Sequence, residues 1–243
     1  MVRHFIYPTI MWQAATIQVA DYAKATISSG TQKAALTNVS IICGQSAQVT
    51  IKDVKINNGG YDEAFVLGFT GSGNTLILEG QNSLEGGFKA PGVRVNSGVY
   101  LTIQGSGSLD AVGGKNAAAI GSQYGINCGN ITINGSVNID ADTSSSLEPK
   151  YSAAIGGGNG GNGGTINISG SAHVIARGGE AGIGGGEEGP VTSINLTGGI
   201  IYAAGGIWGD NELYCILGPC GPLCRRRCFY PEYRVHLARF YRL

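Results

Sequence analysis

The most regular feature of the chain is a phrase of alternating apolar and polar residues that recurs between residues 47 and 206. Two or three apolar residues alternate with polar ones, and a glycine, a short polar stretch and a further apolar residue follow. Such alternation places the apolar side chains on one face of a strand and the polar ones on the other. Clear copies begin at Thr75, Leu101, Ile131, Ile166 and Ile194, and a weaker one begins at Val49.

The spacing of the copies predicts coils of unequal length. Alignment on the first glycine of each copy gives intervals of 25, 30, 35 and 28 residues. A second phrase, a lone Ile between Ala and Gly, lies between the copies at 117–121, 152–158 and 180–186. A lone Ile fits a narrow interior while glycine lets the backbone turn closely around it, so we interpret this phrase as another short side of each coil.

These repeats predict an all-β fold, a parallel β-helix (β-solenoid). Each coil holds two or three strands of about 3 to 5 residues, which are stable only when neighbouring coils pair along their length. A β-propeller is the rival fold, but it needs about 40 residues and four strands in each blade.

The change of pattern along the chain predicts three parts. Residues 1–46 are less repetitive and are expected to be N-terminal strands that cap the solenoid of residues 47–206. The first residues are basic and then apolar, yet Pro8 and Gln13 interrupt them, which favours a first strand or cap over a signal peptide. Residues 207–243 form a Cys-, Arg- and aromatic-rich tail, expected to be irregular.

Composition supports this prediction and excludes two classes of function. The chain has 42 glycines in 243 residues and only 13% charged residues, which suits short strands and tight corners. The net charge is zero, but six Arg fall within residues 224–243, so the body is mildly acidic and a poor match for nucleic acid. No apolar run approaches the ~20 residues of a membrane span.

The glycine-rich stretches at 153–170, 180–186 and 99–109 resemble repeats of bacterial (Firmicutes-type) cell-surface proteins. They are also similar to β-helical carbohydrate-binding domains of clostridia. The resemblance covers roughly residues 47–206 and excludes the tail. It implies an extracellular or cell-surface β-helix that binds polysaccharide or a cell-surface glycan, with Ca²⁺ as a candidate ion and no other cofactor.

Carboxylates are the main candidates for chemistry. The glycine alignment places Glu85, Asp110 and Asp140 at one offset, with Asp142 two residues further on. In register on adjacent coils they would lie about 4.8 Å apart, close enough to share Ca²⁺, which takes oxygen ligands. The alternative, which we favour, is a set of solvated surface acids.

Other candidate residues are less specific. His173 and Arg177 are close enough in sequence to form a site, although a surface pair is the simpler interpretation. The body aromatics show no periodic stripe. Four cysteines of the tail suggest two disulfides or a zinc site, although an unselected reading frame would also give such a composition. They are Cys215, Cys220, Cys224 and Cys228.

The sequence therefore predicts a non-catalytic extracellular module that binds carbohydrate or mediates adhesion. One alternative is a β-helical polysaccharide lyase or hydrolase. Another is a self-assembling filament subunit, because the open ends of a solenoid present unpaired strand edges.

Overall fold

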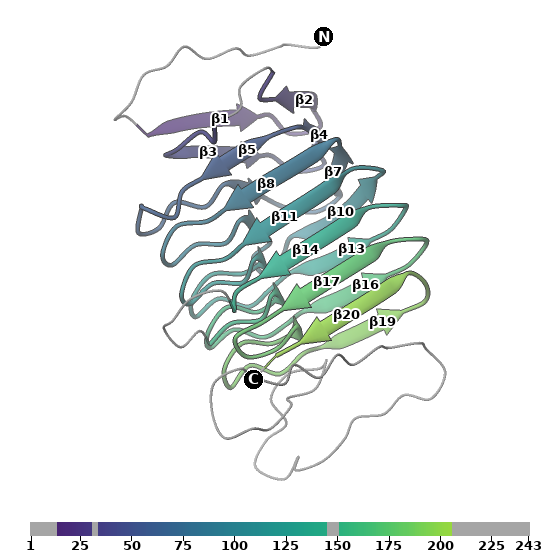
Figure 1. Cartoon of the computed structure of the whole chain (residues 1–243). Helices are drawn as coiled ribbons and strands as arrows, with labels where there is room; N and C mark the ends of the chain where they lie inside the picture. Colours follow the sequence, from purple (N-terminus) through teal and green to yellow (C-terminus); the bar gives the residue numbers. More distant parts are fainter. Residues whose placement is uncertain (1–13, 31–33, 145–150, 206–243) are drawn as a thin grey trace, which may run out of the picture.

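The computed structural model describes residues 14–30, 34–144 and 151–205, and all their regular structure is β. Twenty strands form three parallel sheets around a solenoid of seven coils (Figure 1). Each complete coil contributes one strand to sheet A, then one to sheet B and one to sheet C. The predicted parallel β-solenoid is confirmed, with three strands in each complete coil. Within the described ranges, no helix is long and apolar enough to cross a membrane.

The strands of each sheet follow one another in chain order. Sheet A consists of β1 (Ala15–Val19), β3 (Val39–Cys43), β6 (Leu67–Phe69), β9 (Val93–Arg94), β12 (Ile120–Gly121), β15 (Ile155–Gly156) and β18 (Ile183–Gly184). Sheet B consists of β2 (Lys24–Ser28), β4 (Gln48–Lys52), β7 (Asn74–Glu79), β10 (Tyr100–Gly105), β13 (Asn130–Ile133), β16 (Thr165–Ile168) and β19 (Ser193–Leu196). Sheet C, in front in Figure 1, consists of β5 (Lys55–Asn57), β8 (Gln81–Glu85), β11 (Ser108–Val112), β14 (Asn138–Asp142), β17 (His173–Arg177) and β20 (Ile200–Ala204).

The ladders extend further toward the N-terminus than the repeat does in the sequence. Strand β1 pairs with β3, and β2 pairs with β4, both in parallel. An isolated bridge joins Leu36 to Ile56 and supplies the third side of the first coil. The described residues before 47 are therefore coils of the solenoid themselves. The sequence ends, residues 1–13 and the tail from 206, lie outside the described residues, so self-association through the solenoid ends stays a prediction.

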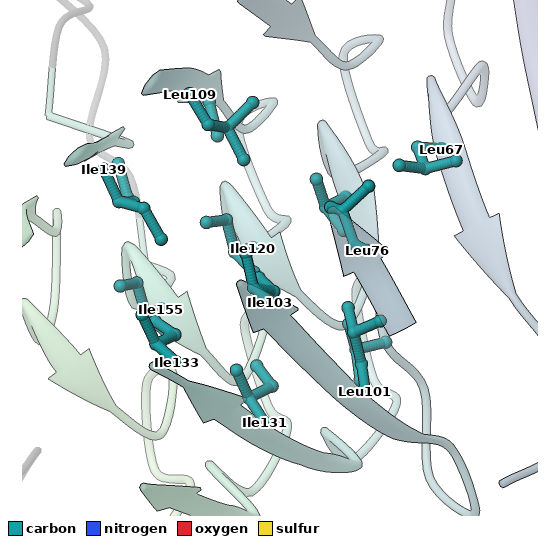
Figure 2. Packing of buried hydrophobic residues seen from close by; sticks show 14 of the residues in the cluster. Leu67, Leu76, Leu101, Ile103, Leu109, Ile120, Ile131, Ile133, Ile139 and Ile155 are labelled. Atoms are coloured by element: carbon teal, nitrogen blue, oxygen red, sulfur yellow. The ribbon is translucent and has the colours of Figure 1, made fainter. Parts of the chain in front are cut away.

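Inward-pointing side chains stack in columns along the axis of the solenoid (Figure 2). The register places like residues opposite each other in neighbouring coils, and each of these side chains is at most 2% exposed. The apolar positions that recur in the sequence are the ones that stack in the interior, so the sequence repeat reflects the stacking of the core. Examples of stacked pairs are Leu101 with Ile131, Ile103 with Ile133, Ile120 with Ile155, and Leu109 with Ile139.

Glycine occupies the outward position of sheet A in the last three coils, where the φ angles of +148°, +132° and +150° disfavour a side chain. Gly121, Gly156 and Gly184 stack in one column, and all three are buried. The loop after β15 bonds directly to the corner before β12, where Asn159 N–H donates to the carbonyl of Asn116 at 3.1 Å. A Cβ on Gly121 or Gly156 would lie 1.9 Å from the carbonyl oxygen of the next glycine in the column. The phrase predicted to be a short side of each coil is thus sheet A.

Buried asparagines tie neighbouring coils together at the corners. The Asn82 side chain is 2% exposed and reaches three coils. Its Oδ1 accepts from the Val54 N–H at 3.0 Å, and its Nδ2 donates to the carbonyls of Glu79 at 3.0 Å and Ser108 at 3.1 Å. Every hydrogen-bonding group of this amide is therefore used, as burial requires.

Replacing Asn82 with alanine is expected to lower the free energy of unfolding by about 2–4 kcal/mol. The substitution leaves the Val54 N–H and two carbonyls unpaired in the interior, at about 1–3 kcal/mol for each group that water does not reach. Urea unfolding followed by circular dichroism measures the loss. Asn138→Ala is the control, because Asn138 is exposed on β14. Equal losses for the two variants would contradict this account.

Two cysteines lie in the interior as free thiols. Cys43 ends β3 of sheet A, and Cys128 lies in the corner before β13. Burial raises the pKa of each thiol to about 12. Both therefore behave as small apolar core residues at neutral pH.

Candidate functional site

The outer face of sheet C carries a column of side chains that changes in character along the solenoid. Asp110 of β11 pairs with Asp140 of β14, as the sequence alignment predicted. The next two positions in this column are Ile175 of β17 and Tyr202 of β20. Two carboxylates are therefore followed by an apolar and an aromatic side chain, one strand apart each time.

The predicted place of Glu85 in this column is wrong by two residues. Glu85 pairs with Val112, and Ser83 takes the position opposite Asp110. Gly105 pairs with Leu78 in the ladder, whereas the alignment placed it with Gly80. The copy in β7 therefore has two more residues before its glycine than the copy in β10. Glu85 instead accepts a hydrogen bond from the Asn57 side chain at 2.5 Å.

Arg177 connects the two aspartates of β14. Its Nη2 lies 2.5 Å from Oδ1 of Asp140, and its Nε lies 3.5 Å from Oδ2 of Asp142. Asp142 also accepts hydrogen bonds from the backbone and hydroxyl of Ser144, at 2.6 and 2.8 Å. The hydrogen bond to Asp140 is the main cause that raises the pKa of Arg177. These three charged side chains form a fixed network rather than independent surface groups.

Asp110 lies beside this network and has no ion-pair partner among the described residues, and the pKa of its carboxyl is shifted. Partial burial raises its pKa, and the negative charge of Asp140 raises it further. Lys55, in the same column two strands away, acts in the opposite direction. Asp110 is therefore the carboxylate of the column that gains most from a hydrogen-bond donor or cation supplied by a ligand.

The four predicted calcium ligands do not come together in one cluster. Within the described ranges, no group of three or more His, Cys, Asp or Glu is arranged to hold a metal ion. Val112 separates Glu85 from Asp142 in their shared column, and Arg177 already pairs with Asp140 and Asp142. Calcium binding stays a prediction, centred on Asp110 and Asp140.

An aromatic pair lies at the C-terminal end of the same face. The rings of His173 and Tyr202 meet edge to face, with centroids 5.8 Å apart and an interplanar angle of 83°. Ile200 stands opposite His173 in the register and is 55% exposed. His173 and Arg177 leave the same strand on the same side, but the first contacts Tyr202 and the second contacts aspartates. The suggested His–Arg site is therefore divided between two neighbouring groups.

Sequence reasoning placed Tyr202 in this column but did not identify it as a ring beside His173. The signal was the register itself, because His173 and Tyr202 belong to adjacent copies and lie at positions two residues apart.

The tail cysteines Cys215, Cys220, Cys224 and Cys228 lie outside the described residues. Comparisons with protein family models, curated proteins and solved structures found no match.

Proposed function

We propose that this protein is a non-catalytic, extracellular or cell-surface module that binds polysaccharide or a cell-surface glycan through the outer face of sheet C. The observation that carries the proposal is the order of side chains from β11 to β20. Carboxylates, a guanidinium and an aromatic pair occupy successive strands of one face. Successive strands lie about 4.8 Å apart, so the face offers contacts at regular steps to a ligand that itself repeats.

The chemistry of this face suits sugar rings. The carboxylates of Asp110 and Asp140 accept hydrogen bonds from hydroxyl groups, and Arg177 donates them. Tyr202 and His173 present apolar ring surface that covers the C–H groups of a sugar ring. The side chains project from strands rather than from loops, which holds them in fixed positions. A glycan therefore meets both kinds of contact that it needs on one rigid surface.

The proposal is tested by affinity electrophoresis against a panel of plant and microbial polysaccharides. We expect Tyr202→Ala to weaken binding of the best ligand by about tenfold, as for a central aromatic contact. Tyr100→Ala is the matched control, because Tyr100 is an exposed tyrosine at the start of β10 in sheet B. Repeating the assay with EDTA tests calcium, and weaker binding without the ion would support a site at Asp110 and Asp140.

Three results would contradict the proposal. Binding to no polysaccharide in the panel would favour a purely structural role. Equal weakening by the two tyrosine variants would remove sheet C as the binding face. Release of unsaturated oligosaccharides that absorb ultraviolet light would identify a polysaccharide lyase instead.

A further inference from the structure

A cation on sheet A is held between an aromatic ring and a glycine. The guanidinium carbon of Arg94 lies 3.6 Å from the centre of the Phe65 ring. Gly68 is opposite Arg94 in the ladder, and a Cβ built on it would lie 3.1 Å from both Nε and Nη2. Because residue 68 has no side chain, there is room for the guanidinium of Arg94 beside it.

Arg94 has no anionic partner within the described residues. The ion pairs there involve Lys52, Lys89 and Arg177. Burial lowers the pKa of Arg94, which means that the charged form has lost part of its hydration without a carboxylate in return. A guanidinium placed in this way gains strongly from an oxyanion, because its in-plane N–H groups bind two oxygens of the anion as a pair.

Arg94 lies between two glycines in the ladder of sheet A. Its two ladder neighbours in that column are Gly68 and Gly121. After β9 the chain reaches sheet B through residues 95–99, whereas after β12 it takes the longer path 122–129. Arg94 is therefore the last outward side chain of this column before the glycines of β12, β15 and β18.

The corners that lead into sheet A add two exposed rings and a second cation. Phe88 N–H donates to the carbonyl of Tyr61, and Lys115 N–H donates to that of Phe88, so the three residues stack on successive coils. Tyr61 is 37% exposed and Phe88 49% exposed. The ammonium of Lys115 lies 5.9 Å from the centre of the Phe88 ring. Apolar ring surface and positive charge thus occur together on this side of the solenoid.

We propose that Arg94, held by Phe65, is a binding site for an oxyanion group of an acidic polysaccharide, whose sugar rings contact Phe88 and Tyr61. The shared chemistry is a carboxylate or a sulfate ester. This site lies on a different sheet from the glycan face of sheet C and does not depend on it. It would give the protein a preference for acidic over neutral polymers.

Isothermal titration with paired ligands tests this site. The pairs are oligogalacturonate with its fully methyl-esterified form, and dextran sulfate with dextran, which separate carboxylate from sulfate. We expect the protein to bind the charged member of at least one pair at least tenfold more tightly than its neutral partner. Arg94→Gln should remove most of that difference, and Arg94→Lys should restore only part of it, because the ammonium lacks the planar donor pair.

Lys52→Gln is the matched control, because it removes one positive charge from the exposed side of sheet B. Phe65→Leu is a second test that keeps the charge but removes the ring beneath it, and it should also weaken the acidic ligand. Thermal unfolding of each variant verifies that it is folded.

The proposal is overturned if charged and neutral members of both pairs bind equally. It is also overturned if folded Arg94→Gln, or folded Phe65→Leu should the former not fold, binds like Lys52→Gln. Tyr202→Ala separates the two sites. If it abolishes the preference for acidic ligands while the Arg94 variants keep it, the preference belongs to sheet C and the site at Arg94 is rejected.

Discussion

Alanine in place of Gly121 is expected to lower the free energy of unfolding by about 4 kcal/mol, from the combined cost of backbone strain and overpacking. The φ angle of Gly121 is +148°, a conformation that side chains disfavour. Its new Cβ would lie 1.9 Å from the carbonyl oxygen of Gly156 in the next coil. Strands β12 and β15 must separate to accommodate it, which breaks the ladder in the middle of sheet A.

Thermal unfolding measures this loss, and a chain of this size should unfold about 10 °C lower. The control is Gly125→Ala, because Gly125 also has a positive φ, of +68°, but nothing lies within 4 Å of its added Cβ. That variant has only the backbone cost of about 1–2 kcal/mol. Similar losses for the two glycines would show that conformation alone, and not the contact between coils, makes glycine necessary at residue 121.

Ile133→Ala is expected to cost about 2–5 kcal/mol, as is typical when a buried Ile becomes Ala and leaves a cavity. Ile133 is completely buried and stacks between Ile103 and Ile168 of the neighbouring coils. These coils are held by their own ladders, so they cannot close the space without losing strand register. The cost should therefore fall in the upper half of the range.

Urea unfolding of Ile133→Ala is compared with that of Ile200→Ala, which shortens the same side chain on the exposed face of β20. The surface variant should change stability by less than about 0.5 kcal/mol. A large loss for Ile200→Ala would mean that another part of the protein covers this face. A small loss for Ile133→Ala would contradict the stacked core.

The alternating phrase predicted most of the fold because it records the core directly. Ile131 and Ile133 point inward, as do the residues that pair with them in the neighbouring copies, because these positions form the core. Coils built from similar phrases therefore pair in register. The first coils were harder to recognise. Strand β2 at Lys24–Ser28 has only half-buried apolar residues.

The candidate site could be predicted only in part, because it depends on register and on partners from other coils. Two extra residues before Gly80 in the copy of β7 moved Glu85 by two positions and out of the column of Asp110. The pairing of Arg177 with Asp140 and Asp142 joins residues 35 and 37 positions apart. The contact of Arg94 with Phe65 is not repeated in the described coils, because the same column holds Gln18 and Ile42 in the first two coils and glycine in the rest.

The two interior thiols lie at different heights in the stack, Cys43 in the second coil and Cys128 in the fifth. A thiol with a pKa of about 12 reacts with an alkylating reagent at neutral pH only after its surroundings have opened. Each coil is supported mainly by its two neighbours, so different stretches of a solenoid are free to open at different rates. The alkylation rates of the two cysteines, measured separately by peptide mass spectrometry, would therefore report how fast the second and the fifth coil open. Equal rates mean that the solenoid opens as one unit, and unequal rates show at which of the two coils it opens first.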